Sequence, residues 1–134
     1  MAGWLALDWG GRKVGYATAD EEGLVVTPRG RLERSKAKSR PWELLPHDVM
    51  LLKKLIKDFE PDRIILGLPL NADGTESAGS VGARALAPKL SEALGGLEVI
   101  LVPEILTSWS SRGERDEDAS AAATLLTDYF AKRA

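Results

Sequence analysis

Residues 6–20 read ALDWGGRKVGYATAD, two apolar runs separated by a pair of glycines. Each run is short and bounded by polar or glycine-rich sequence, and the Asp-Trp-Gly-Gly-Arg segment between them has the composition of a tight turn. We therefore expect strands over 4–8 and 13–19 that pair as an antiparallel hairpin. After the turn at DEEG, the run LVVTPRGRL predicts a third strand over 24–32.

The rest of the chain alternates between helical and strand patterns. Apolar residues at spacings of three and four predict an amphipathic helix over 42–60 that stops before Pro61. A continuous apolar run at 63–70 predicts a buried strand, a helix is expected over 77–94 with a kink or restart at Pro88, a strand over 98–102, and a final helix over 118–130. This order predicts an α/β fold with a five-stranded mixed sheet, three strands antiparallel and then two parallel, and helices on both faces.

Length and composition indicate one globular domain over residues 1–134. The chain has 44% hydrophobic and 28% charged residues and no cysteine, so disulfides, thiolate metal sites and cysteine nucleophiles are excluded. The start of the chain lacks the pattern of a secretion signal, and no apolar stretch approaches the roughly 18 residues of a membrane span. We expect a cytoplasmic protein without a membrane partner.

The formal charge of −2 hides a local concentration of basic residues. The segment RGRLERSKAKSR, residues 29–40, carries six basic residues against one acidic residue. Such a strip can contact the phosphates of a nucleic acid, or it can be a solvated surface segment that only aids solubility. The basic residues are Arg29, Arg31, Arg34, Lys36, Lys38 and Arg40.

Two familiar kinds of site are disfavoured by the residues present. His47 is the single histidine, which excludes histidine-rich metal sites, and its place near the start of a predicted helix favours a surface position. The glycines around residue 10 suggest a phosphate loop, but Tyr16 and Ala17 stand where a Walker loop needs lysine and a hydroxyl residue.

Carboxylates at the ends of predicted elements are the remaining candidates for chemistry. Asp8 ends the first strand, Glu104 follows the strand over 98–102, and Asp118 begins the last helix. Taken one at a time, each also has an ordinary interpretation, as a turn residue, a solvated loop residue and a helix N-terminal acid. The topology can bring all three to one side of the sheet, where hard oxygen ligands suit Mg²⁺ or Mn²⁺. Two such ions support phosphodiester hydrolysis.

The sequence resembles the YqgF/RuvX family, relatives of the RuvC Holliday-junction resolvases with the RNase H-like fold. The opening stretch ALDWGGRKVGYATAD is similar to the family's Asp-x-Gly hairpin, LGLPLNADG at 66–74 to its Gly-Leu-Pro-Leu-Asn segment, and DASAAATLLTDYF to its C-terminal alanine-rich helix. The resemblance covers nearly the whole chain in the same order. It implies that Asp8, Glu104 and Asp118 are the catalytic, metal-binding acids.

One motif departs from the family pattern. The family commonly has Asp-Glu-Arg-Leu-Thr where this chain has Pro103-Glu104-Ile105-Leu106-Thr107, so the glutamate keeps neither its acidic nor its basic neighbour. The loss of the arginine puts a substrate contact in doubt, and Pro103 fixes the backbone beside Glu104.

The resemblance implies a metal-dependent nuclease of structured nucleic acid, acting either on Holliday junctions and branched DNA or on the 5′ end of pre-16S ribosomal RNA. A homodimer is one option, because a resolvase needs two active sites on one junction. In such a site Arg12 and Lys13 would lie near the Asp8 turn, and Asn71 could hydrogen-bond a phosphate or the attacking water. Tryptophans beside two of the acids could stack on a base or pack in the core, namely Trp9 and Trp109.

Two alternatives belong to other functional classes. The altered Pro103-Glu104-Ile105 segment is compatible with a non-catalytic nucleic-acid-binding or regulatory module of the same fold. The Asp8 to Gly15 turn also resembles the phosphate loop of actin-like ATPases, but those proteins close a second domain over the nucleotide, and 134 residues do not supply one.

Overall fold

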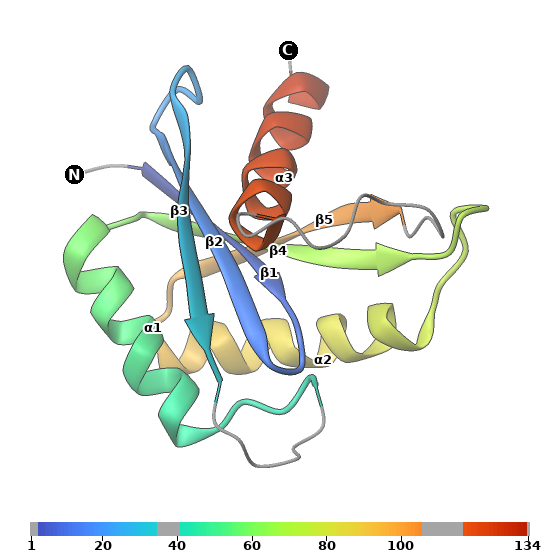
Figure 1. Cartoon of the computed structure of the whole chain (residues 1–134), viewed down its shortest axis with the longest axis horizontal. Helices are drawn as coiled ribbons and strands as arrows, with labels where there is room; N and C mark the ends of the chain where they lie inside the picture. The colour runs from blue at the N-terminus through green and yellow to red at the C-terminus, as the bar shows by residue number, and fades with distance from the viewer. Residues whose placement is uncertain (1–2, 35–40, 106–116, 134) are drawn as a thin grey trace.

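The computed structural model describes residues 3–34, 41–105 and 117–133, with side chains over 3–34, 41–104 and 119–132. Five strands and three helices follow one another in the predicted order (Figure 1). They are β1 (Gly3–Trp9), β2 (Lys13–Asp20), β3 (Val26–Glu33), α1 (Pro46–Phe59), β4 (Arg63–Leu70), α2 (Ala78–Ala93), β5 (Glu98–Ile105) and α3 (Glu117–Arg133).

The strands form one mixed sheet in the order β3-β2-β1-β4-β5. The β1–β2 and β2–β3 pairs are antiparallel, whereas β4 pairs in parallel with both β1 and β5. The predicted fold class is therefore confirmed. Several boundaries differ, and among them β3 begins at Val26 rather than at residue 24, because Leu24 and Val25 lie exposed before it.

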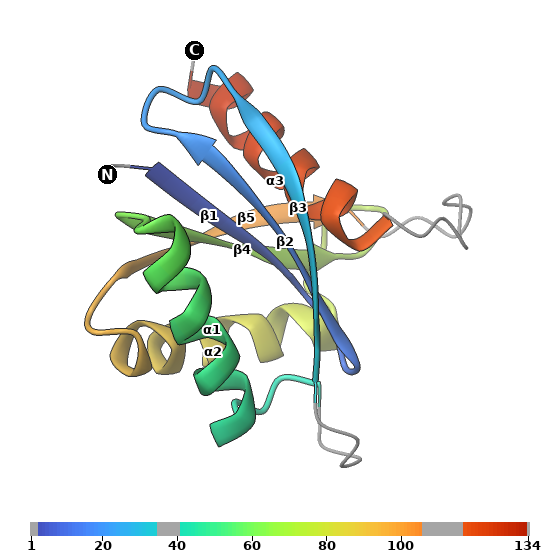
Figure 2. The ribbon, with the colours of Figure 1, turned by 60° about the vertical axis from the view of Figure 1, so that its left-hand side comes forward.

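Helices cover both faces of the sheet, with α1 and α2 on one face and α3 on the other (Figure 2). Side chains alternate along β1, so the strand contributes to the core on both faces of the sheet. Leu5 and Leu7 pack with α1 and α2, whereas Trp4 and Ala6 pack with α3. At the start of β1, Trp4 contacts the aromatic rings of Tyr129 and Phe130 near the end of α3. This contact fixes the direction in which α3 crosses the sheet.

Helix α1 begins at Pro46, four residues later than the sequence pattern indicates. A proline inside a helix lacks a backbone donor and forces the preceding residue toward extended geometry, which Leu45 adopts with φ −96° and ψ 157°. At the other end, Glu60 takes the left-handed conformation, with φ 47° and ψ 53°, immediately before Pro61. The helix therefore stops where predicted.

Helix α2 continues through Pro88, where the sequence predicts a kink or restart. It is one helix from Ala78 to Ala93, and its buried residues Leu86 and Leu90 lie on both sides of the proline in the core. Burial of these side chains outweighs the hydrogen bond that the proline removes. None of the helices in the described part of the chain could span a lipid bilayer.

Candidate active site

Two of the three predicted acids come to the same edge of the sheet. Asp8 is the last residue but one of β1 and pairs with Gly15 of β2. Glu104 lies inside β5 opposite Pro69 of β4, so the expectation that it follows the strand is wrong. The parallel ladder extends past Val102 because β4 itself continues to Leu70. Since β1, β4 and β5 run parallel, their carboxyl ends share one edge.

Asp8 and Glu104 also belong to the same face of the sheet, the face covered by α3. Ala6, two residues before Asp8, and Val102, two residues before Glu104, both pack in the α3 layer. Because side chains alternate along a strand, positions 8 and 104 share that face. Strand β4 separates β1 from β5 in the sheet.

Pro69 lies opposite Glu104 in the β4–β5 register, but the Glu104 side chain lies over Gly67 of β4, which has no side chain. A Cβ atom built on Gly67 would lie 3.0 Å from Glu104 Oε1 and 3.2 Å from Leu125 Cδ1 of α3. The Glu104 carboxylate therefore lies close over the bare backbone of Gly67, beneath α3. Gly67 is a site residue that the carboxylate pattern misses, and its signal in the sequence is an isolated glycine in an apolar strand, which indicates close approach.

The surroundings of Glu104 disfavour its charged form. Burial raises the pKa of Glu104 above its ordinary value. A positive charge placed beside this carboxylate would reverse that effect, because an opposite charge within a few ångström stabilises the ionised acid. The site thus has an acid whose charge is unfavourable until a cation offsets it.

Position 118 lies near the start of α3, at the same end of the molecule. Leu125 of α3 lies over Gly67 of β4. Tyr129 and Phe130, further along α3, contact Trp4 near the start of β1. The beginning of α3 therefore extends toward the carboxyl ends of β1 and β4. The Asp118 side chain is outside the described residues, and among the side chains that are described no three histidine, aspartate or glutamate residues group as a metal site.

The predicted basic contacts divide into several environments. Arg12 is exposed and Lys13 half-buried at the β1–β2 turn next to Asp8. On the edge strand β3, Arg29 donates to Thr18 at 2.9 Å and stacks over Phe59, and Arg31 pairs with Glu33 at 3.2 Å. His47 is exposed, as predicted. The other candidates, Lys36, Lys38, Arg40 and Trp109, lie outside the described residues.

Two predicted nucleic-acid contacts need correction. Trp9 is 7% exposed and packs in the core with α1 and α2, and its indole N–H donates to the Pro41 carbonyl at 2.6 Å, so it is not available to stack on a base. Arg34 is 6% exposed and pairs with Asp48 at 2.7 Å. The basic run at 29–40 does not show from the sequence alone that Arg34 is buried.

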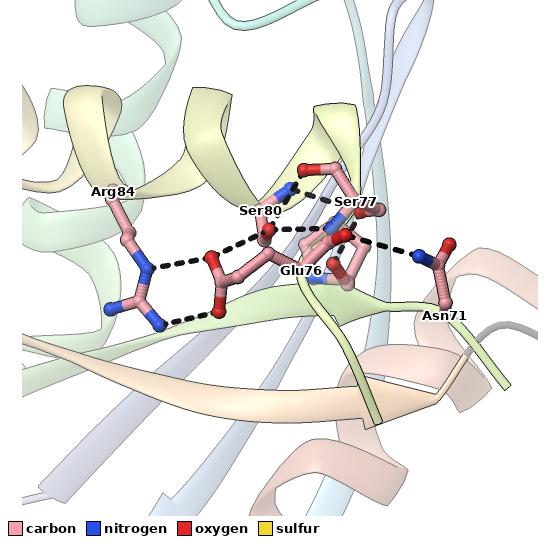
Figure 3. Close-up of polar contacts among 6 residues, drawn as sticks. Asn71, Glu76, Ser77, Ser80 and Arg84 are labelled. Carbon is pink, nitrogen blue, oxygen red and sulfur yellow. Dashed lines mark hydrogen bonds and ion pairs between the residues drawn. The ribbon is translucent and has the colours of Figure 1, made fainter. Parts of the chain in front are cut away.

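Asn71 has its amide donors committed to the loop that follows β4. Its amide nitrogen donates to Thr75 Oγ1 at 3.0 Å. It also donates to the Glu76 carbonyl at 3.0 Å (Figure 3). Glu76 in turn accepts from Arg84 and from Ser80, which lowers the pKa of Glu76 below its ordinary value. The amide nitrogen of Asn71 thus organises this loop, and a phosphate contact through it would have to replace these bonds.

Comparison with known proteins identifies the family. The family model described as "RuvX: Holliday junction resolvase" matches residues 2–132. The chain belongs to the RuvX family. A relative from Anaeromyxobacter sp. (strain K), named "Putative pre-16S rRNA nuclease", is 34% identical over 145 aligned residues that cover 97% of each chain. A relative of the same name from Cronobacter sakazakii is 29% identical over 94% of each chain.

The fold of this RuvX family member is also found in a solved structure. RuvC of T. thermophilus, in complex with a Holliday junction substrate, superposes with a TM-score of 0.52 at 14% identity. The match covers 98% of this chain and 94% of RuvC. The RNase H-like fold predicted from the sequence is confirmed.

Proposed function

We propose that this RuvX family member is a divalent-metal-dependent nuclease that hydrolyses phosphodiester bonds of structured nucleic acid. The observation that carries the proposal is the placement of Asp8 and Glu104 on one face at the carboxyl ends of β1 and β5, with Gly67 between these strands. The family description and the names of the relatives support the substrate class. They give two candidates, a Holliday junction and pre-16S rRNA.

The residues present fit a divalent cation. Carboxylate oxygens are the ligands that Mg²⁺ and Mn²⁺ prefer. A Cβ atom at position 67 would lie 3.0 Å from Glu104 Oε1, so the glycine leaves that space beside the carboxylate open. The third ligand in the proposal is Asp118, which helical spacing places one turn before Ala122 and two turns before Leu125, both buried against the sheet.

Each part of the chain has a distinct task in this reaction. When bound, a pair of divalent ions supplies an activated water and charge stabilisation for the leaving oxygen. Asp8, Glu104 and Asp118 would hold the ions, and the apolar side chain of Leu125 limits water around Glu104. Arg12 and Lys13, at the turn after Asp8, would neutralise substrate phosphates. The basic strip over 29–40 would extend that contact, except for its buried member Arg34.

The experiment is a cleavage panel with Mn²⁺, using a four-way DNA junction, single-stranded DNA and a pre-16S rRNA fragment. We expect wild type to cut one of the two structured substrates and Asp8→Asn to lose the activity while remaining folded. Asp58→Asn is the matched control, because Asp58 is an exposed acid of α1 that lines a pocket with Gly3 and Trp4, at the opposite end of β1 from Asp8. Equal cleavage by wild type and Asp8→Asn would refute the assignment.

A second candidate function is a nucleic-acid-binding module without catalysis. It is favoured by Pro103 and Ile105, which replace the acidic and basic neighbours of Glu104 in the family pattern. Calorimetric titration with Mn²⁺ separates the two functions, because the module is expected to bind nucleic acid without binding the metal. Sedimentation of the protein with a four-way junction would show whether two copies act together, as a resolvase requires.

A further inference from the structure

A buried arginine lies directly behind the candidate active site. Arg34 follows β3, and its side chain is 1% exposed beside an Asp48 side chain that is 3% exposed. Taking a charged pair out of water is unfavourable unless the geometry is good and the remaining hydrogen-bonding groups are satisfied. The contacts of Arg34 meet that condition in full.

All five N–H groups of the guanidinium have acceptors. Nε and Nη2 donate to the two carboxylate oxygens of Asp48 at 3.1 and 2.7 Å. Nη1 donates to the carbonyls of Gly10 and Pro41 at 3.0 and 2.7 Å, and Nη2 also donates to the carbonyl of Glu43. The guanidinium therefore ties the turn after β1 to the segment that leads into α1.

The same guanidinium also holds Trp9, the residue after Asp8. Its central carbon lies 4.8 Å from the centre of the Trp9 ring, and the Trp9 indole N–H donates to the Pro41 carbonyl that Arg34 also contacts. Trp9 and Asp8 are neighbours on opposite faces of β1, so the rotation of the strand at Trp9 sets the orientation of Asp8.

We propose that Arg34 is a positioning residue for the candidate active site, acting on Asp8 through Trp9 and Gly10. The inference rests on the proposed function, because it assigns a role relative to the metal-binding acid. It replaces the phosphate contact that the sequence suggests for Arg34. Lysine cannot substitute, because an ammonium lacks the planar fork that reaches a carboxylate and three carbonyls while stacking on an indole.

A second arginine, Arg63 of β4, stacks on a tryptophan at the other end of β1 and provides a matched control. Arg63 stacks over Trp4, at 4.9 Å from the ring centre, and pairs with Glu98 at 3.4 Å. Trp4 is the second residue of β1 and Trp9 is its last. Arg63→Lys therefore removes an arginine–tryptophan contact from the same strand without touching the turn beside Asp8.

The test compares Mn²⁺ binding by calorimetry and substrate cleavage in wild type, Arg34→Lys and Arg63→Lys. For Arg34→Lys we expect the Kd for Mn²⁺ to rise about tenfold at unchanged stoichiometry, the low end of the effect of groups that orient metal ligands. We expect kcat to fall with little change in KM, and to recover partly at high Mn²⁺. A loss of stability alone would lower the stoichiometry instead of raising the Kd. Arg63→Lys should match wild type.

A second variant keeps the proposal testable if Arg34→Lys does not fold. Arg34→Met with Asp48→Asn removes the buried charges while leaving an acceptor for the Leu45 N–H, which Asp48 accepts at 3.0 Å. This double variant should fold and show the same weakened Mn²⁺ binding. Wild-type Kd and kcat in either folded variant would overturn the proposal.

Amide resonances separate this proposal from the proposed function. If wild type neither binds Mn²⁺ nor cuts any substrate, the proposed function fails. The position of the β1 end can still be read from the backbone amides of residues 8–11 in a ¹H–¹⁵N spectrum. Shifts there in Arg34→Lys but not in Arg63→Lys support positioning, and unshifted resonances in Arg34→Lys refute it.

Discussion

Replacing Gly67 with alanine places a methyl group against the carboxylate of Glu104. The new Cβ would lie 3.0 Å from Glu104 Oε1, whereas ordinary van der Waals contact begins at 3.4 Å, so the carboxylate must withdraw by about 0.4 Å. A misplacement of 1 Å in a catalytic group can cost about 10²-fold in rate. Scaling that effect to the required displacement predicts a roughly five- to tenfold loss in kcat.

The same substitution should leave the fold intact. The closer of its two contacts is the movable end of a side chain, and Gly67 has no left-handed backbone angle that an alanine would strain. Overpacking costs about 1–3 kcal/mol, and the reduced freedom of the unfolded chain returns about 0.4–1 kcal/mol. We expect the free energy of unfolding in urea to fall by no more than about 2.6 kcal/mol, the largest cost less the smallest return.

The assay measures kcat and KM with the substrate that the cleavage panel identifies. Gly30→Ala is the control, because Gly30 lies on β3, at the opposite edge of the sheet from Glu104, and its Cβ would make only an ordinary contact of 3.4 Å with the Tyr16 hydroxyl of β2. Full activity in a folded Gly67→Ala protein would show that the space over Gly67 plays no part in the reaction.

Three further predictions concern charge and packing. Glu104→Gln should stabilise the metal-free protein at about pH 8, because burial raises the pKa of Glu104 and folding therefore opposes its ionisation. Below the ordinary pKa of 4.5, the increase in the free energy of unfolding in urea should vanish. An equal increase at both pH values would contradict this prediction. Gly82→Ala should destabilise the fold by about 1–3 kcal/mol in urea, because a Cβ there overlaps the Trp42 indole; unchanged stability would refute this packing. Arg12→Ala with Lys13→Ala should weaken nucleic-acid binding and reduce the slope of log K against log salt by about 2, and an unchanged slope would remove both residues from the interface.

The sheet and two of the acids could be predicted because they follow from local rules. The unbroken apolar run at 63–70 requires a strand covered on both faces, and parallel strands have their carboxyl ends at one edge. These rules were sufficient to bring Asp8 and Glu104 together. They misplaced the end of β5, since the pairing of Glu104 with Pro69 depends on how far the neighbouring strand extends.

The features that were missed depend on contacts between distant parts of the chain. Arg34 reads as one of six basic residues in a strip, yet its partners are Asp48 on α1 and the carbonyl of Gly10 on the first hairpin. Burial of a charge is decided by whether tertiary partners satisfy it. Pro88 reads as a helix breaker, but the packing of its neighbours in the core determines the outcome.

The most direct test of the central claim is to locate Mn²⁺ by its paramagnetic effect on the amide resonances of the protein. With substoichiometric Mn²⁺, the amides of Asp8, Gly67 and Glu104 should broaden before others, and Asp8→Asn should abolish that selectivity. Selective broadening elsewhere, for example around Asp20 at the far end of the hairpin, would contradict the claim that the carboxyl ends of β1 and β5 form a metal-binding active site.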